Sequence, residues 1–476
     1  MARIAFLALD YLPAIGPGIL TGVVRRAGHQ AQIFFMPDRV FAKDLARFDP
    51  DLIGMSVTSG KVKSCLAMAK WLKLFQPRAR IVVGGAHPTF SSQMISDENV
   101  DFIIRGEAER AIIDLMEALD LKRSSFEGVR GLVWTDENGE IQQEPLAELV
   151  EDLDELPFPD WTPYFARRRL SLFYRRGLTM LSSRGCPFHC TYCQAEAWRT
   201  LYERSKFLRR RSVENVLQEI EELKKKYSVA SVRFDDDDFA QRSEWLRKFA
   251  DQCDEGRGLP FSCNLTARNT SDKVAAFLRR AGCYMVSIGL ESGDSHIRRE
   301  VMCKDLDDED IINAAKALKK HGIMVQTYNL FGVPEETFET ALSTWRLNRK
   351  IMPDFAWCSL FQPYPGTKLH ERILRENNMQ EEDLDFPQNY FERTTFRDRR
   401  MSRITAVQKL TQVLLWFRAP ETVARFLAGL GDNSIYRMVF WFSYTIAQIK
   451  TKRLSIFGSF VFAFINRPSR WKPPKK

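Results

Sequence analysis

The chain has 476 residues, of which 45% are apolar and 28% are charged. This is the composition of a globular protein with enough apolar residues for buried cores, and the length indicates two or three domains. The 70 basic and 61 acidic residues give a net charge of +9, an excess too small to argue by itself for a nucleic-acid partner.

The cysteine count and the start of the chain both bear on location. Nine cysteines, an odd number at low density, argue against a disulfide framework. The first residues run directly into a strand-like apolar segment and lack the apolar region and cleavage site of a signal peptide. We therefore expect a reducing, cytoplasmic location.

The first 145 residues alternate between apolar strands and amphipathic helices. Buried strands that alternate with helices predict a parallel, doubly wound α/β sheet. Ligands of such sheets bind beyond the carboxyl ends of the strands. The predicted strands cover residues 3–8, 31–35, 52–56, 80–84 and 100–104, and a helix is expected at 61–75.

Glycines and small polar residues gather where these strands end. They comprise Gly16, Gly18, Ser56 with the three residues after it, Gly84, Gly85 and Gly106. Each of these glycines, taken alone, is as well explained by an ordinary turn. As a set they predict a ligand-binding rim along one edge of the sheet.

Turn and proline signals mark the end of this first domain. Residues 131–134 and 140–143 flank a predicted hairpin turn at 136–139. Three prolines between residues 156 and 163 indicate an extended linker. We therefore divide the chain into a first domain at 1–145, a linker at 146–174, a second α/β domain at 175–395 and a helical region at 396–476.

From about residue 178 the alternation of strands and helices begins again. Six strand–helix units are too few for the eight of a closed barrel, so we predict a partial (β/α)6 barrel of parallel strands. Functional residues of such barrels lie at the carboxyl ends of the strands. The predicted strands cover residues 179–183, 231–234, 260–264, 284–289, 324–331 and 357–361.

Cys186, Cys190 and Cys193 lie in one loop after the first of these strands. Three thiolates can hold three irons of a [4Fe–4S] cluster and leave the fourth iron open to a substrate or cofactor. Two alternatives stay open: a chance grouping, and a zinc site with His189 as fourth ligand, although His189 adjoins Cys190 in the same short loop. The other six cysteines are scattered, mostly in apolar surroundings, and are expected to be small buried hydrophobic residues.

Polar side chains also follow the second and fourth strands of the predicted barrel. Asp235 and Asp236 begin an acidic run, and Glu291 precedes Ser292. An acidic run is most often a solvated turn, but carboxylates at a strand end can bind an ammonium group. Glu291 can accept two hydrogen bonds from hydroxyl groups. These residues therefore extend the candidate site around the mouth of the barrel.

The order of these segments resembles the radical S-adenosylmethionine (SAM) superfamily over residues 175–370. The resemblance implies a [4Fe–4S] cluster on Cys186, Cys190 and Cys193, with an open iron that chelates SAM. One electron then cleaves SAM and releases a 5′-deoxyadenosyl radical. It also implies an external electron donor such as flavodoxin or ferredoxin.

The same resemblance implies roles for the other strand ends. Tyr192 matches the aromatic residue near the adenine, Asp235 and Asp236 match the segment that receives the SAM amino group, and Glu291 and Ser292 match the ribose-contacting segment. Gly332 and Pro334 match a Gly-x-Pro-Gly-Glu-Thr turn, in which Glu335 replaces the second glycine. An ordinary strand–helix turn explains Gly332 and Pro334 equally well.

The first domain resembles the cobalamin-binding domain that precedes many radical SAM cores. Residues 84–88 and 100–109 carry the resemblance, which implies cobalamin at the rim formed by Ser56, Gly84, Gly85 and Gly106. The Asp-x-His-x-x-Gly loop that supplies an axial histidine is missing, because residues 10–16 contain no histidine. Bound cobalamin would therefore lack histidine ligation, and a degenerate domain without cobalamin is the alternative. His87 is the only histidine near the rim, in a turn that also works as structure.

The last eighty residues lie outside both resemblances. Helical apolar spacing predicts packed helices at 404–417 and 421–430. Two aromatic-rich segments follow at 438–449 and 454–465, each too short to span a bilayer, with basic residues between and after them. Two interpretations stay open: helices in the interface of an anionic membrane, or a helical pair packed on the barrel.

We expect a radical SAM enzyme that uses cobalamin to transfer a methyl group to an unactivated carbon of a small hydrophobic substrate. A radical oxidative cyclase of a porphyrin-like or lipid-like substrate is a close alternative. An RNA methylthiotransferase fits less well, because the first domain has only Cys65 and the C-terminus looks helical. A non-catalytic cobalamin or iron–sulfur sensor is the third alternative. The sequence singles out no catalytic residue beyond the cofactor sites.

Overall fold

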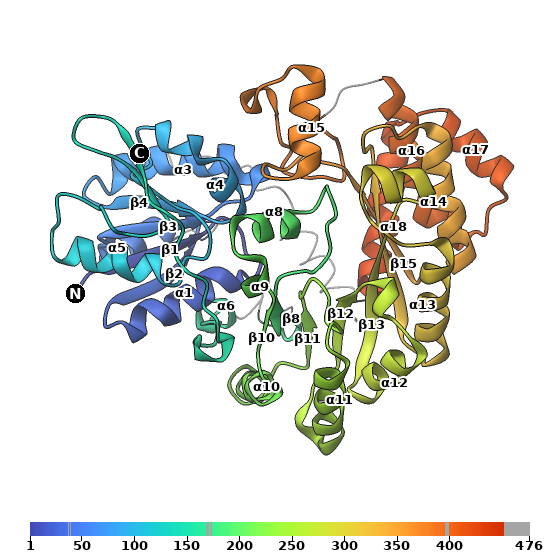
Figure 1. Cartoon of the computed structure of the whole chain (residues 1–476), viewed down its shortest axis with the longest axis horizontal. Coiled ribbons are helices and arrows are strands. Elements are labelled where there is room, and N and C mark those ends of the chain that lie inside the picture. Colours follow the sequence, from blue (N-terminus) through green and yellow to red (C-terminus); the bar gives the residue numbers. More distant parts are fainter. Residues whose placement is uncertain (37, 39, 168–170, 172–173, 396–398, 452–476) are drawn as a thin grey trace.

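The computed structural model describes residues 1–451 except 37, 39, 168–170, 172–173 and 396–398. Two sheets lie side by side, and the C-terminal helices cover the far edge of the second sheet (Figure 1). The predicted α/β architecture is confirmed: a doubly wound parallel sheet, then a curled half-barrel of parallel strands, then helices.

The N-terminal sheet has seven strands in the order β2-β1-β3-β4-β5-β6-β7. β1 to β5 run parallel, whereas β6 and β7 pair antiparallel, so the predicted hairpin extends the sheet edge. The strands are β1 Arg3–Ala8, β2 Gln30–Phe35, β3 Leu52–Ser56, β4 Arg80–Gly84, β5 Phe102–Ile104, β6 Leu132–Thr135 and β7 Ile141–Gln143. The helices are α1 Ile15–Arg26, α2 Phe41–Phe48, α3 Val62–Phe75, α4 Ala86–Phe90 and α5 Ala111–Asp120.

Side chains on the two faces of this sheet enter two different cores. Successive strand residues point to opposite faces, so Ile4 and Phe6 pack in the core that contains α1 and α5. Ala5 and Leu7 pack in the core that contains α2 and α3. Strands buried on both faces read as continuous apolar runs in the sequence, which is why this sheet was predictable.

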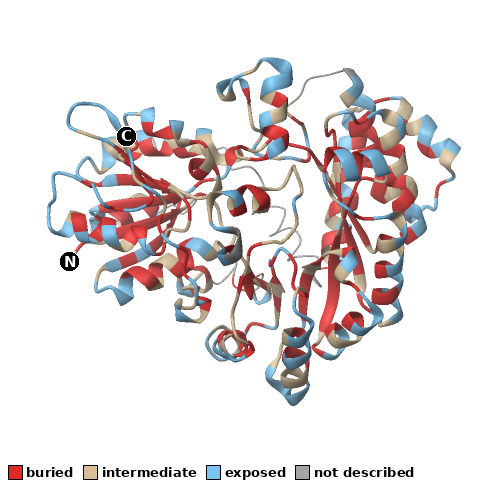
Figure 2. Cartoon of the chain, viewed as in Figure 1, coloured by how far each residue is buried: buried red, intermediate tan, exposed pale blue. Residues whose placement is uncertain are grey.

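The second sheet has six parallel strands in the order β15-β14-β13-β12-β11-β8. Each strand neighbours the next one in the chain, as in a partial barrel, and Figure 2 shows its strands buried beneath partly exposed helices. The strands are β8 Arg176–Met180, β11 Ser231–Phe234, β12 Phe261–Leu265, β13 Cys283–Glu291, β14 Met324–Phe331 and β15 Phe355–Leu360. The helices are α10 Val213–Tyr227, α11 Ser243–Gln252, α12 Asp272–Arg280, α13 Asp308–Lys320, α14 Phe338–Ile351 and α15 Lys368–Asn377.

Side-chain caps fix where several of these helices begin. Ser212, Ser271, Thr337 and Thr367 each accept a hydrogen bond from the backbone N–H three residues later. Such a cap satisfies one of the free N–H groups in the first helical turn. The loops at the carboxyl ends of β12, β14 and β15 therefore have defined lengths, which positions the residues they carry.

Helix α16 Arg399–Trp416 packs beside β15, and α17 Glu421–Gly429 and α18 Ser434–Thr451 pack against α16 (Figure 1). The backbone N–H of Ala356 donates to Gln412 Oε1 at 2.7 Å, and Gln408 Nε2 donates to the carbonyl of Cys358 at 2.9 Å. Helix α16 thus satisfies polar groups that an open edge strand leaves unpaired.

The segment 438–449 belongs to α18, and one face of this helix packs on the barrel. Phe440 and Tyr444 join an aromatic cluster with Phe355 and Phe391. The second aromatic segment, 454–465, lies outside the described residues. Within the described part of the chain, no helix has both the length and the apolar character needed to cross a membrane.

Candidate functional site

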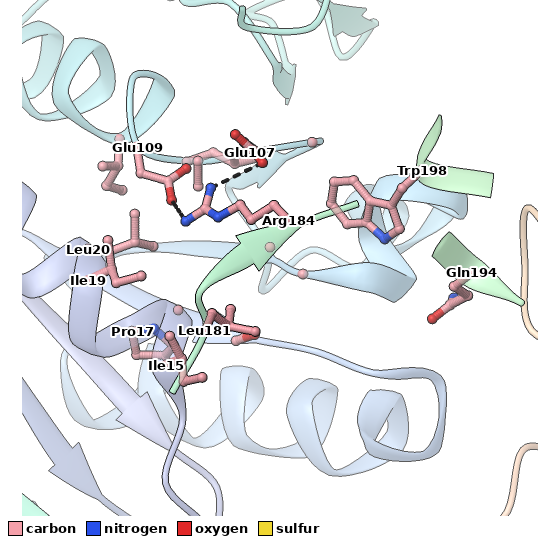
Figure 3. A pocket seen from close by; sticks show the side chains of 18 of the residues that line it. Ile15, Pro17, Ile19, Leu20, Glu107, Glu109, Leu181, Arg184, Gln194 and Trp198 are labelled. Atoms are coloured by element: carbon pink, nitrogen blue, oxygen red, sulfur yellow. Dashed lines mark hydrogen bonds and ion pairs between the residues drawn. The ribbon is translucent and has the colours of Figure 1, made fainter. Parts of the chain in front are cut away.

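A pocket of about 520 Å³ lies between the carboxyl ends of the two sheets. Ile15, Ile19, Leu20 and Leu181 form an apolar wall, and Arg184, Glu107 and Glu109 form a charged one (Figure 3). Among the predicted site residues, Ser56, Gly84, Gly85, Gly106, Asp235 and Asp236 line it. Residues chosen from two separate domains therefore meet at one cavity.

The predicted rim gives this pocket its N-terminal wall. Gly85 has φ +102°, and a Cβ there would lie 3.0 Å from Ser56 Oγ, so the turn after β4 requires glycine. Gly18 does not reach the pocket, because α1 turns it toward the linker, where its Cβ would lie 2.9 Å from Pro159 Cβ. His87 is buried outside the pocket, where its Nδ1 lies 3.1 Å from Ser59 Oγ.

The cysteine loop borders the pocket from the barrel side. It begins after the short strand β9 Ser183–Arg184 and ends at α8 Gln194–Leu201, and both ends of the loop line the pocket. Cys186, Cys190 and Cys193 are half-buried free thiols. Burial raises the pKa of Cys186 and of Cys193 to about 12 each. Across the described residues, no three His, Cys, Asp or Glu side chains converge as ligands of a single metal ion.

A polar group adjoins the cysteine loop at the end of β13. Lys304 Nζ lies 3.1 Å from Glu291 Oε1 and 3.4 Å from Tyr192 Oη. Burial alone would lower the pKa of Lys304, but Glu291 and the nearby Cys190 raise it. The predicted residues Tyr192 and Glu291 are therefore brought together. Sequence reasoning missed Lys304, which follows an irregular loop and belongs to no recognisable motif.

The acidic run after β11 divides into three environments. Asp235 pairs with Arg233, whereas the buried Asp236 accepts hydrogen bonds from Ser182 N–H at 3.0 Å and from Ser182 Oγ at 2.6 Å. Asp237 also lines the pocket, and desolvation together with its two acidic neighbours raises its pKa to about 6. Sequence reasoning named Asp235 and Asp236 but not Asp237.

The remaining predicted residues lie at strand ends outside this pocket. Ser292 is buried, and its carbonyl accepts a hydrogen bond from Arg298 Nη1 at 2.6 Å. Gly332 and Pro334 form the turn between β14 and α14. Glu335 stands where the family has glycine and keeps the left-handed conformation, with φ +66°. The structure thus preserves the turn, while its predicted contact with SAM stays a prediction.

The same turn contains a buried carboxyl group, Glu336, which is 3% exposed. Burial raises its pKa to about 8, although the Gly332 N–H donates to it. An unfolded chain ionises this group near pH 4.5, so stability falls as the pH rises from about 5 to 8. We expect Glu336→Gln to raise the free energy of unfolding by about 3 kcal/mol at pH 8 and little at pH 5.

Thermal unfolding of the parent and Glu336→Gln at both pH values checks this expectation. Glu335→Gln is the control, because Glu335 is exposed and paired with His296 and Arg372. An equal change in melting temperature at pH 5 and pH 8 would contradict a buried proton on Glu336.

Two family models match this chain: the radical SAM superfamily over residues 180–347 and the B12 binding domain over residues 7–116. The chain is 29% identical to an uncharacterized methyltransferase of Pyrococcus horikoshii over 77% of this chain and 79% of that protein. It is 26% identical to the anaerobic magnesium-protoporphyrin IX monomethyl ester cyclase of Rubrivivax gelatinosus over 74% of this chain and 65% of that protein.

A solved structure has the same fold. The cobalamin-dependent SAM radical enzyme OxsB, with aqua-cobalamin and SAM bound, aligns with a TM-score of 0.68 and 17% identity over 97% of this chain and 72% of that one. The two domain matches confirm the predicted radical SAM and B12-binding domains and agree with SAM and cobalamin as cofactors, and the radical SAM family implies the [4Fe–4S] cluster. The chain therefore has the domain composition of a radical SAM enzyme, with a B12-binding domain before its radical SAM domain.

Proposed function

We propose that this enzyme is a cobalamin-dependent radical SAM methyltransferase that acts on an unactivated carbon. One observation carries the proposal: a single pocket is bordered by the glycine rim of the B12-binding domain and by both ends of the cysteine loop. Methyl transfer through cobalamin requires both cofactors to face one cavity. The methyltransferase relative from Pyrococcus horikoshii supports the same reaction class.

The residues present fit these cofactors. Cys186, Cys190 and Cys193 would hold three irons of the cluster, because thiolates are the usual ligands of such clusters. Lys304 and Glu291 offer a cation and a carboxylate beside that loop, which suits the carboxylate and the ribose hydroxyls of SAM. When bound, the cluster and SAM supply a 5′-deoxyadenosyl radical and cobalamin carries the methyl group.

The pocket wall favours a hydrophobic substrate. Ile15, Ile19, Leu20 and Leu181 line one side, and Trp198 projects from α8 at another (Figure 3). Apolar walls with a few placed polar groups are typical of small-molecule sites. The cyclase relative, named for a porphyrin ester, supports oxidative cyclisation of a similar substrate as the second candidate.

Neither an RNA methylthiotransferase nor a sensor gains support from the structure. A methylthiotransferase needs a second cluster, but Cys65 is the only cysteine of the first domain, and it is a buried residue of α3 that contacts Met55 of β3. A sensor would not need a substrate-sized cavity between the two cofactor sites.

Anaerobic reconstitution with iron, sulfide and hydroxocobalamin tests the proposed function. With SAM and a reductant such as reduced flavodoxin, the protein should release 5′-deoxyadenosine, and SAM labelled in its methyl group should label bound cobalamin. 5′-Deoxyadenosine without any labelled cobalamin would favour the cyclase. Absence of both products from a protein with a full cluster would end the proposal.

We also propose that α17 and α18 bind an anionic membrane surface. On α18 the exposed residues Ile435, Met438, Phe442 and Ile446 recur every three or four positions and form one apolar stripe. Phe426 on α17 is 67% exposed as well. Soluble monomers seldom leave such stripes uncovered.

Charge complements these apolar side chains. Residues 399–451 carry eight basic and two acidic residues, and residues 452–476 carry seven basic and no acidic residues. The preceding 398 residues therefore have a net charge of −4, so the basic excess of the whole chain lies at this end. Apolar side chains beside lysine and arginine are typical of helices that lie on anionic lipid.

We expect the protein to float with phosphatidylcholine vesicles that contain phosphatidylglycerol, and not with phosphatidylcholine alone. Phe426→Ser with Phe442→Ser should lower this binding by roughly tenfold or more, because the variant lacks two exposed aromatic side chains that would enter the lipid. Leu74→Ser with Leu121→Ser is the control, with 70% and 67% exposed side chains on the other domain. Equal flotation of both double variants would contradict the proposal that α17 and α18 bind the membrane.

A further inference from the structure

Two sequence motifs that the proposed reaction leaves unused meet in the structure. One is Glu107 and Glu109 in the loop after β5, and the other is Arg184, two residues before Cys186. Arg184 Nη1 lies 3.1 Å from Glu107 and Nη2 lies 2.6 Å from Glu109 (Figure 3). The three side chains are 18%, 12% and 9% exposed, so this contact between the domains is largely buried.

A second arginine binds the same carboxylate. The short strand β10 Arg209–Arg210 pairs antiparallel with β9, and the pairing sets Arg209 opposite Arg184. Arg209 donates to both oxygens of Glu107, at 2.9 and 2.6 Å, and to the carbonyl of Val150 at 2.7 Å. Burial alone would raise the pKa of Glu107, but the two arginines lower it. The carboxylate therefore stays ionised between two cations.

The backbone of this loop is held as closely as its side chains. The N–H of Glu107 donates to Tyr202 Oη at 2.9 Å. Gly106 has φ +80°, and a Cβ there would lie 2.0 Å from the same Tyr202 oxygen. Tyr202 of the barrel domain thus accepts a hydrogen bond from the main chain of the rim, next to a position where only glycine fits.

The other side of the two-stranded ribbon is anchored to the barrel. Asp236 accepts hydrogen bonds from the Ser182 backbone and hydroxyl, and Arg210 Nη1 lies 3.2 Å from the same hydroxyl. The ribbon formed by β9 and β10 is therefore fixed at the barrel by Asp236 and at the B12-binding domain by Glu107 and Glu109. It continues directly into Gly185 and Cys186.

We propose that Arg184 is a positioning residue, and that its ion pairs with Glu107 and Glu109, supported by Arg209, form a clamp that sets the separation of the cobalamin and cluster sites. This proposal rests on the proposed function only for the identity of the two cofactors, cobalamin and the iron–sulfur cluster. Charged partners suit this role because separating a buried ion pair leaves an uncompensated buried charge, which is unfavourable. The arrangement of the domains that keeps the pairs together is therefore favoured over neighbouring arrangements. A misplacement of the reacting groups by about 1 Å can lower the reaction rate roughly 100-fold, so a loss of the clamp should slow the reaction.

The test compares Arg184→Met with the parent and with Arg25→Met. Arg25 pairs with Asp160 at 2.8 Å, on the surface between α1 and the linker, so Arg25→Met also removes an ion pair outside the clamp. Amide hydrogen exchange of the protein without cofactors is measured at residues 104–110 and 181–186. Arg184→Met should accelerate exchange in both segments by about tenfold or more, and Arg25→Met should leave both unchanged.

The reconstituted protein provides a second measurement, the distance between the two cofactors, which would not change if Arg184 only stabilised the fold. Pulsed electron paramagnetic resonance between the reduced cluster and cob(II)alamin should give one narrow distance in the parent and a broadened distribution in Arg184→Met. Arg184→Lys, which keeps the charge but reaches one carboxylate, should fall between the two and serves if Arg184→Met does not fold.

Unchanged exchange and an unchanged distance distribution in Arg184→Met would overturn the clamp. A parent protein that loads no cobalamin would instead overturn the proposed function, and the exchange measurement would then decide the clamp by itself.

Discussion

Replacing Cys186 with alanine is expected to abolish SAM cleavage. Two thiolates cannot hold a four-iron cluster in the geometry that leaves one iron open, so the electron has no path to SAM. The rate of 5′-deoxyadenosine release should fall by at least about 1000-fold, which corresponds to more than about 4 kcal/mol in the activation barrier. Iron and sulfide content after anaerobic reconstitution should fall together with the rate.

Cys253→Ala is the matched control for this prediction. Cys253 is a half-buried free cysteine at the end of α11, on the outer layer of the barrel, and it lines no part of the pocket. Its substitution should leave iron content and product formation unchanged. If Cys186→Ala kept a full cluster and parental product formation, the three cysteines would not be the ligands.

The strand ends could be predicted from the sequence because parallel strands place them together. Ser56 and Gly84 end two strands that read as apolar runs and Gly106 follows a third, and a doubly wound sheet brings such ends to one edge. The same rule placed Asp235 beside the cysteine loop. Periodicity and turn residues are local signals in the sequence, and these two signals were enough to predict which residues lie at the strand ends.

Contacts that join the two domains had no such signal. Arg184 and Glu107 are separated by 77 positions and lie in different sheets. Glu107 belongs to the segment 100–109 and Arg184 precedes the cysteine loop, and their pairing depends on how the domains dock. Lys304 was missed for a related reason, since only the irregular loop after β13 returns it to Glu291.

Conformation at single residues explains two further differences. In the acidic run the side chains alternate, so Asp236 and Asp238 are buried while Asp235 and Asp237 are exposed along the enclosing walls of the pocket. Alternating side chains cannot be assigned to the buried or the exposed face from the sequence alone unless the end of the strand is known. At Glu335, an ion pair with Arg372 accompanies a left-handed backbone that residue type alone would not predict.

Lys304→Met is expected to weaken SAM binding while leaving the fold intact. The substitution keeps the apolar length of the side chain but leaves Glu291, with a side chain only 12% exposed, without its cation. The carboxylate of SAM would then bind near the uncompensated carboxylate of Glu291, which is unfavourable. We expect the SAM dissociation constant to rise by about 100-fold, equal to about 2.7 kcal/mol, and 5′-deoxyadenosine release at low SAM to fall by a similar factor.

Equilibrium dialysis of the reconstituted protein with labelled SAM measures this directly. Lys320→Met is the control, because Lys320 pairs with Asp272 on the exposed face of α13 and should bind SAM as the parent does. Lys304→Arg should recover part of the affinity, since it restores the charge with a different shape. An unchanged dissociation constant in Lys304→Met, with iron content also unchanged, would show that the Lys304–Glu291 pair only supports the loop. A loss of cluster together with a loss of SAM affinity would show instead that Lys304 supports the cluster at Cys190, whose thiol pKa burial raises and Lys304 lowers.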